Sequence, residues 1–328
     1  MLDINSKILA LILNIRGDKL INESKILITG GTGSFGKWMT KRLLEMNAKK
    51  IVIFSRDEQK QELMQREFCN FDNIDYIIGD IRNYDSINDS LKGIDIVYHA
   101  AAMKIITACE RHPIECLKTN VLGTNNVSLA SKKNDVKKSI LISTDKSVKP
   151  INFYGMSKGM AEKIFLSNYL SKTSFNVVRY GNVIGSRGSV IPYFKELITS
   201  NKPLKITSKE MTRFLITLDE AIDLVIKATL LDYNNCIFVP DIPSCNILDL
   251  AISMGGVNYP IEYMGIRPGE KIHECLINEE EMRRTIKKDN YYVIMPFGKY
   301  DGGKEEEYIS SSNLLNAEDI KGILKNCG

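Results

Sequence analysis

The sequence predicts an α/β fold built on a doubly wound parallel sheet, with a smaller second part towards the C-terminus. Short apolar runs recur along the first 180 residues and alternate with segments of helical periodicity. A glycine-rich turn joins the first run to the first helix, and small or polar residues follow the later runs. Because ligands bind beyond the carboxyl ends of the strands in such sheets, we expect one binding edge.

The first expected strand, Lys25 to Thr29, leads through a glycine-rich turn into a helix that starts near Lys37. The G-x-x-G-x-x-G spacing lets backbone approach a pyrophosphate at a helix N-terminus. Trp38 stands where a P-loop needs Ser or Thr, which argues against nucleoside triphosphate hydrolysis. We therefore predict a dinucleotide site, with turn contacts at Gly30, Thr32, Gly33, Ser34, Phe35 and Gly36.

The second expected strand, Ile51 to Phe54, is followed by Arg56 and Asp57. An acid at this position binds the ribose of NAD, whereas Arg accommodates the 2′-phosphate of NADP. Arg56 favours NADP, and Asp57 leaves NAD as the alternative. Ser55 and Lys60 lie beside Arg56 and are candidate cofactor contacts as well. Two further apolar runs are expected to end at the same edge of the sheet, and the residues that follow them, Asp80, Ile81, Ala100, Ala101 and Ala102, complete the candidate contacts.

The apolar run Ile140 to Ile142 is followed by Thr144, and a helical segment beyond it carries Tyr154 and Lys158. Residues four apart share one face of a helix. A neighbouring ammonium lowers the pKa of a phenol towards working pH, as a general base for a sugar hydroxyl requires. The pair predicts hydride-transfer chemistry with both side chains near the cofactor, although a packed aromatic beside a solvated cation gives the same spacing.

A loop rich in glycine and polar residues follows the sixth expected strand, Asn176 to Tyr180. Further on, Arg213 and Arg267 offer guanidinium groups suited to bidentate contact with a diphosphate. We expect an N-terminal helical extension over 1–23, a cofactor domain over 24–180 and a partly interleaved substrate region over 181–328.

Composition excludes several classes of function. The 328 residues carry a net charge of only +4, which does not call for nucleic acid. Seven cysteines without C-x-x-C spacing and three separate histidines favour neither a disulfide framework nor a metal site. The apolar run over residues 8–13 is too short to span a bilayer. We expect a cytoplasmic homo-oligomer, a dimer or hexamer, without a metal or transmembrane segment.

Several motifs together resemble the extended short-chain dehydrogenase/reductases: TGGTGSFG at 29–36, the Tyr154 and Lys158 pair, RYGNVIGSRGSVIPYF at 179–194, MTRF at 211–214 and RPGEKIHE at 267–274. More narrowly, STDKSVKPINFYGMSK looks like the UDP-N-acetylglucosamine 4,6-dehydratases of pseudaminic acid and related surface-sugar biosynthesis. Its most specific part is Thr-Asp-Lys, because dTDP-glucose dehydratases carry Thr-Asp-Glu there and simple 4-epimerases lack the pair.

The resemblance implies a reaction without net redox. Tyr154 would deprotonate the C4 hydroxyl, oriented by Thr144, while hydride passes to tightly held NADP. Asp145 would protonate the departing C6 hydroxyl, and either Lys146 or Lys104 would act at C5. Because Asp145 and Lys146 are adjacent and of opposite charge, each favours the ionised form of the other, and only strong desolvation would make both neutral. We expect the two groups to titrate as one coupled unit.

The same resemblance implies a UDP-sugar substrate. The product could be the C5-epimerised 4-keto sugar, the C5-retained sugar or a 5,6-ene. A UDP-sugar 4-epimerase and a non-catalytic NADP-binding regulator remain as alternatives. The implied substrate contacts are Lys104, Asn182, Arg187, Val190, Arg213, Arg267 and Glu270.

Overall fold

The computed structural model describes residues 19–185, 189–296 and 306–325. The chain forms two compact units whose segments alternate along the sequence. The first comprises Met1–Ile142, Met160–Val178 and Ile222–Ile237, and the second Ser143–Gly159, Arg179–Ala221 and Phe238–Gly328. Residues 19–23 are helical, and the rest of the expected N-terminal extension, residues 1–18, lies outside the described residues.

A nine-stranded sheet confirms the predicted α/β fold. Its strand order is β14-β15-β10-β6-β5-β4-β1-β2-β3, and β1 pairs in parallel with both β2 and β4. The pairs β2–β3 and β4–β5 are also parallel, whereas β14–β15 is antiparallel. The strands of this sheet are β1 (Lys25–Thr29), β2 (Lys50–Ser55), β3 (Ile74–Ile78), β4 (Ile96–His99), β5 (Lys138–Thr144), β6 (Ser174–Tyr180), β10 (Ile237–Pro240), β14 (Thr285–Lys287) and β15 (Tyr291–Ile294).

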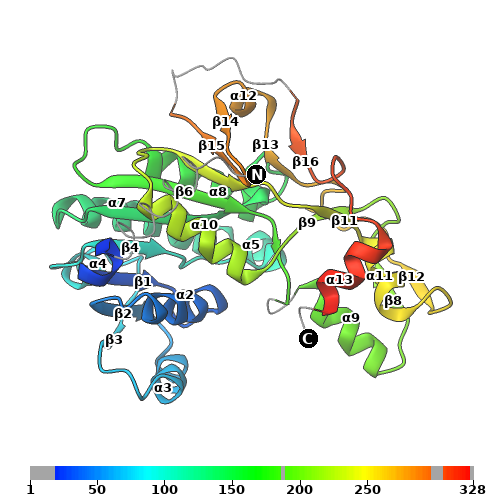
Figure 1. Ribbon diagram of the computed structural model, residues 1–328, viewed down its shortest axis with the longest axis horizontal. Helices are drawn as coiled ribbons and strands as arrows, with labels where there is room; N and C mark the ends of the chain where they lie inside the picture. Colours follow the sequence, from blue (N-terminus) through cyan, green and yellow to red (C-terminus); the bar gives the residue numbers. More distant parts are fainter. Residues whose placement is uncertain (1–18, 186–188, 297–305, 326–328) are drawn as a thin grey trace, which may run out of the picture. The chain divides into compact units, whose positions relative to one another are not determined.

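Helices follow the strands in the order that the sequence predicts (Figure 1). In the first part of the chain they are α2 (Ser34–Glu45), α3 (Glu58–Glu67), α4 (Tyr84–Ser90), α5 (Ile106–Arg111), α6 (Pro113–Cys116), a π-helix (Leu117–Leu122) and α7 (Gly123–Lys133). A 3₁₀ turn (Asp145–Ser147), α8 (Phe153–Leu166) and α10 (Leu218–Leu230) come later.

Apolar side chains on both faces of the strands explain why this sheet forms. Leu27, Val52 and Phe54 are buried with Ile87 of α4 and Val127 of α7 in one core cluster. Parallel strands covered on both faces have continuous apolar sequences, which is the pattern of residues 26–28 and 51–54.

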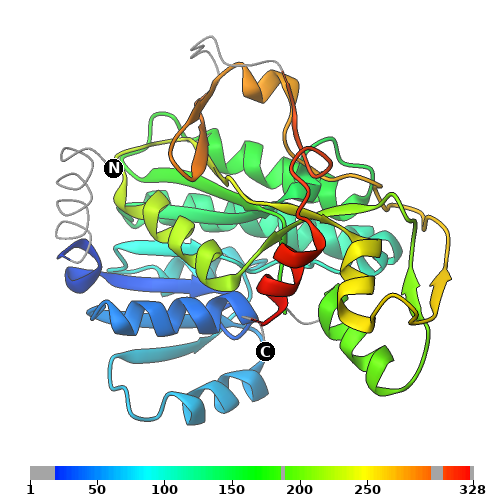
Figure 2. The same ribbon diagram turned by 45° about the vertical axis from the view of Figure 1, so that its right-hand side comes forward.

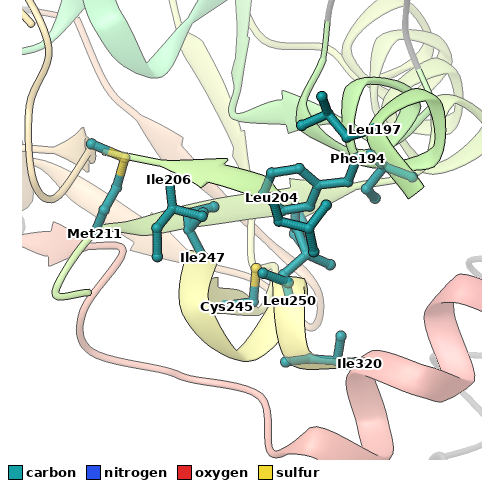
Figure 3. Close-up of a cluster of buried hydrophobic side chains, with 12 residues drawn as sticks. Phe194, Leu197, Leu204, Ile206, Met211, Cys245, Ile247, Leu250 and Ile320 are labelled. Atoms are coloured by element: carbon teal, nitrogen blue, oxygen red, sulfur yellow. The ribbon is translucent and has the colours of Figure 1, made fainter. Parts of the chain in front are cut away.

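A second apolar core lies wholly in the second unit. Phe194 of α9 (Val190–Thr199) and Leu204 of β8 (Leu204–Ile206) pack with Leu250 of α11 (Ile247–Gly255) and Ile320 of α13 (Ala317–Lys325), as Figure 3 shows. The same three helices gather in Figure 2. The remaining elements are β7 (Asn182–Val183), β9 (Thr212–Ile216), β11 (Ser244–Asn246), β12 (Ile261–Tyr263), β13 (Cys275–Ile277), α12 (Glu279–Met282) and β16 (Tyr308–Ile309).

Within the described ranges, no helix combines the length and the apolar character that crossing a membrane would demand.

A buried ion pair in the second unit provides a test of the packing. Arg179 of β6 makes two bonds to the carboxylate of Glu281 in α12, at 2.9 and 3.0 Å, and one to the carbonyl of Leu276 at 2.8 Å. Burial acts to raise the pKa of Glu281, but the guanidinium group outweighs it and holds that pKa below its usual value.

Arg179→Met should lower the free energy of unfolding by about 3–5 kcal/mol, because it leaves the Glu281 carboxylate buried without its cation. Urea denaturation followed by circular dichroism measures this change. Arg66→Met, which removes an exposed pair with Glu62, is the control and should change stability by about 0.5 kcal/mol or less. Equal effects of the two variants would contradict the prediction.

Candidate active site

The glycine turn after β1 is shaped for close backbone approach. Gly30 has φ +66°, and a Cβ there would lie 2.9 Å from the backbone of Ala101. A Cβ on Gly36 would lie 2.2 Å from the carbonyl oxygen of Gly31, so α2 packs directly on the turn. Gly33 precedes α2, and no side chain in the described part of the molecule caps that helix. Its first N–H groups therefore fit the pyrophosphate of a dinucleotide.

Charged residues after β2 divide into two groups. Asp57 caps α3 by accepting from the backbone N of Lys60 at 3.0 Å, and its carboxylate also pairs with the Lys60 ammonium at 2.6 Å. Hydrogen bonds from Lys60 lower the pKa of Asp57. Arg56 is exposed, with its Nη1 3.7 Å from Oδ2 of Asp80, which Arg82 binds more closely at 2.6 Å. Asp57 is thus engaged by its own helix, while Arg56 extends towards solvent.

The other predicted cofactor contacts differ in exposure. Ser55 and Ile81 are buried, and Ile81 belongs to the core cluster of the first unit. The backbone N of Ala101 donates to Oγ1 of Thr29 at 3.2 Å, and this bond ties the segment just after β4 to the end of β1. Ala102 is exposed beside it.

Helix α8 carries Tyr154 and Lys158 one turn apart, as predicted. Asn152 caps this helix, accepting from the backbone N of Gly155 at 2.7 Å. Tyr154 is half-buried and Lys158 is 4% exposed. The two side chains thus share one face of α8, and the ammonium is the more buried of the two.

Two glycines let α8 pack closely on the segment after β5. A Cβ on Gly155 would lie 2.2 Å from the carbonyl oxygen of Lys146, and one on Gly159 would lie 3.1 Å from that of Ser147. Neither glycine was among the predicted site residues, and their G-x-x-x-G spacing spans Lys158. They bring the helix of the predicted base against the turn that carries Asp145.

Asp145 is the most enclosed of the predicted catalytic residues. Its side chain is fully buried, and its Oδ1 accepts from Oγ1 of Thr144 and from Nζ of Lys146, both at 3.0 Å. Its Oδ2 is buried without a hydrogen-bond partner among the described residues. The same Lys146 ammonium lies 3.1 Å from Oε1 of Glu274. Two buried carboxylates therefore share one cation.

This arrangement shifts the pKa of each group. Burial raises the pKa of Asp145, partly opposed by Lys146 and reinforced by Glu274. Burial acts to lower the pKa of Lys146, but Asp145 and Glu274 outweigh it and raise that pKa. For Glu274, burial is outweighed by Lys146, Arg213 and Lys271, so its pKa is lowered. The cluster thus favours a protonated Asp145, an ammonium on Lys146 and a charged Glu274.

Arg213 is turned towards backbone carbonyls. Its guanidinium group donates to the carbonyl oxygens of Thr212, Ile272 and Lys271 at 2.7, 3.1 and 2.9 Å. Its Nε lies 3.9 Å from Oε1 of Glu274. The group for which we predicted a diphosphate contact thus braces the segment before β13 in this structure, and the contact stays a prediction.

The other predicted substrate contacts are distributed over the second unit. Arg267 is exposed and forms an ion pair with Glu270, whose carboxylate also accepts from Thr207 at 3.3 Å. Asn182 of β7 has a buried Oδ1 without a hydrogen-bond partner among the described residues. Val190 begins α9, and Arg187 lies outside the described residues.

Lys104 lies in the first unit, in an exposed segment whose start is fixed by a buried amide. The Asn120 side chain accepts from the backbone N of Met103 at 2.8 Å and donates to its carbonyl oxygen at 2.9 Å. Asn120 also donates to Sγ of Cys116 at 3.3 Å. It sits in the π-helix, a rare geometry that often marks functional sites. No spacing in the sequence indicated this contact.

Comparison with known proteins places this geometry in a family. Residues 26–296 match the model of a polysaccharide biosynthesis protein family. A UDP-N-acetylglucosamine 4,6-dehydratase (inverting) of Campylobacter jejuni subsp. jejuni is 45% identical over 287 residues, covering 86% of this chain and 85% of that protein. A UDP-glucose 4-epimerase of Rickettsia bellii is 44% identical over 328 residues, covering 93% and 96%.

The solved structure of Pen from Bacillus thuringiensis is similar over 93% of this chain and 98% of that one, with a TM-score of 0.88 and 36% identity. The family relatives thus include both nucleotide-sugar dehydratases and epimerases. With its glycine turn, its Tyr154 and Lys158 helix and its mostly parallel sheet, this chain belongs to the polysaccharide biosynthesis protein family.

Proposed function

We propose that the protein is a UDP-N-acetylglucosamine 4,6-dehydratase. The observation that carries this proposal is the buried carboxyl group of Asp145, whose surroundings favour its protonated form beside Thr144 and Lys146. A 4-epimerase needs a hydroxyl, a tyrosine and a lysine but no second acid. The similarity to the Campylobacter dehydratase supports the same activity.

The first step would be oxidation at C4 of the sugar. Tyr154 would take the proton of the C4 hydroxyl, with the charge of Lys158 stabilising the phenolate and Thr144 orienting the sugar oxygen. When bound, the nicotinamide cofactor supplies a hydride acceptor for C4 and a hydride donor for C6. The ketone at C4 then makes the C5 proton acidic.

The second step would be loss of water. Asp145 would give its proton to the departing C6 hydroxyl, so that water leaves as the C5–H and C6–O bonds break. Either Lys146 or Lys104 would act at C5, where the group that takes the proton must first give up its own. While Lys146 is held charged by its neighbours, it would stabilise negative charge on the sugar. Hydride return to C6 and proton return to C5 leave no net redox change.

NADP is the proposed cofactor, since Arg56 is exposed after β2 while Asp57 is bound to Lys60. Arg56→Ala should weaken NADP binding by roughly 10–100-fold and leave NAD binding unchanged, because a charge-assisted contact to the 2′-phosphate is lost. Calorimetric titration of cofactor-free protein measures both affinities. Arg66→Ala, which removes an exposed arginine of the helix α3 that follows Arg56, is the control. An equal loss for both cofactors would contradict the assignment.

The alternative activity is UDP-sugar 4-epimerisation, which the similarity to the Rickettsia bellii protein favours. Proton NMR of the purified protein with UDP-N-acetylglucosamine in deuterated water distinguishes the two. A C6 methyl signal with a 4-keto product would establish the dehydratase, and the C5 couplings would show inversion or retention. An olefinic C6 signal would mean release of a 5,6-ene. Appearance of the C4 epimer alone would overturn the proposal.

We further propose that the 4-keto sugar serves pseudaminic acid or related surface-sugar biosynthesis and that the protein acts as a homo-oligomer. Analytical ultracentrifugation of the holoenzyme would test the second point, with a dimer or hexamer expected and a monomer contradicting it.

A further inference from the structure

Glu274 is a buried carboxylate for which the proposed chemistry has no direct use. Its side chain is nearly inaccessible, at 2% exposure, and it lies far in sequence from the Thr-Asp-Lys segment. We propose that Glu274 is a positioning residue that holds the ammonium of Lys146 and thereby keeps the carboxyl group of Asp145 protonated. This inference rests on the proposed function for its role in catalysis.

The geometry of Lys146 carries the first step of the argument. Its Nζ lies 3.0 Å from Oδ1 of Asp145 and 3.1 Å from Oε1 of Glu274. An ammonium between two carboxylates divides its attraction between them, so Asp145 has only part of a counter-charge. Without Glu274, Asp145 and Lys146 would favour an ion pair in which both groups are charged. Asp145 would then have no proton to give to the C6 hydroxyl.

Glu274 keeps its own charge because other cations face it. Nζ of Lys271 lies 3.8 Å from its Oε2, and Nε of Arg213 lies 3.9 Å from its Oε1. Its backbone N donates to Oγ of Ser310 at 2.9 Å, which fixes the chain just before β13. Lys271 also donates to the carbonyl oxygen of Val148, so this cation is fixed as well.

The charged groups facing the Asp145 carboxyl therefore act in opposite directions. Lys146, from the 3₁₀ turn, favours the ionised form. Glu274, together with the complete burial of Asp145, favours the protonated form, and the pKa of Asp145 is raised on balance. Burial of Glu274 is outweighed first by Lys146 and then by Arg213 and Lys271, so its pKa is lowered. Removing the charge of Glu274 should therefore lower the pKa of Asp145 for two reasons. The repulsion between the two carboxylates ends, and the ammonium of Lys146 is left to interact with Asp145 alone.

Infrared titration of the holoenzyme tests this directly. Protonated carboxyl groups give a C=O stretching band in the infrared spectrum. The part of this band that is missing in Asp145→Asn belongs to the protonated Asp145. In Glu274→Gln we expect this band to be lost at a pH lower by about one unit than in the unchanged protein. Glu274→Ala, which also removes the charge but leaves room for water, provides a second reading and should shift in the same direction.

Glu281→Gln is the matched control, because Glu281 is also a buried carboxylate with an ion pair in the same unit, bound to Arg179 instead of Lys146. Glu281→Gln should lower the stability of the protein and leave the pH at which the Asp145 band is lost unchanged. The alkaline limb of kcat/KM should move with the infrared band in the two Glu274 variants only. An unmoved band in both variants, or a shift to higher pH, would overturn the inference. If the unchanged protein formed no dehydrated sugar, the proposed function would fail, whereas the infrared titration would still decide the effect of Glu274.

Discussion

Replacing Asp145 by Asn is expected to lower the rate of 4,6-dehydration by about 10²–10⁴-fold, the usual contribution of a general acid. The amide is nearly isosteric and can still accept from Thr144 and Lys146, which both contact Oδ1 in the present structure. It cannot release a proton to the C6 hydroxyl. The loss should therefore fall on elimination and spare oxidation at C4.

Two readouts separate these steps. The absorbance of reduced nicotinamide should rise when UDP-N-acetylglucosamine is added to the Asp145→Asn holoenzyme, while no C6 methyl signal forms. Asp319→Asn, an exposed acid of α13, is the control and should behave like the unchanged protein. Normal dehydration by Asp145→Asn would remove the main support for the dehydratase and return the epimerase reading to first place.

Much of the fold could be predicted from the sequence because its determinants are local. The runs at 26–28 and 51–54 are apolar and rich in isoleucine, and the segments next to them carry turn residues and helical periodicity. Patterns of a few residues therefore predict β1, β2 and α2. The glycine turn is also local, since its spacing alone indicates where backbone must approach backbone. Tyr154 and Lys158 share a helix and need no tertiary information to be paired.

The parts that the sequence did not reveal depend on contacts between distant segments. Glu274 lies at the end of the RPGEKIHE motif, yet nothing in that motif shows that it meets Lys146. The resemblance suggested a diphosphate contact for Arg213, whereas tertiary structure turns its guanidinium group onto backbone carbonyls and Glu274. The hydrogen bond from the backbone N of Met103 to the Asn120 side chain likewise joins two segments whose contact the sequence does not indicate.

The protonation of the Asp145 and Lys146 pair shows how such contacts change a chemical conclusion. Sequence reasoning foresaw that two adjacent opposite charges would favour two ionised groups unless desolvation was strong. Complete burial supplies the desolvation for Asp145, but the second carboxylate at Glu274 keeps Lys146 charged. The pKa of Asp145 and the pKa of Lys146 are therefore both raised, a combination that neither residue predicts by itself.

Tyr154→Phe should lower turnover by about 10²–10⁴-fold, as does the loss of a general base, and should block the reaction earlier than Asp145→Asn does. Without the phenol oxygen the C4 hydroxyl keeps its proton, so hydride cannot leave C4 and the C5 proton never becomes acidic. The expected result is neither reduced nicotinamide nor a C6 methyl signal, measured as for Asp145→Asn.

Tyr169→Phe, which changes an exposed tyrosine beyond the end of α8, is the matched control and should retain full turnover. The double variant Tyr154→Phe with Asp145→Asn should match Tyr154→Phe alone in showing no reduced nicotinamide, because a reaction stopped at C4 never reaches the step that Asp145 serves. Reduced nicotinamide in the Tyr154→Phe holoenzyme would show that another group deprotonates C4. The two single variants thus order the steps, with oxidation at C4 preceding elimination across C5 and C6.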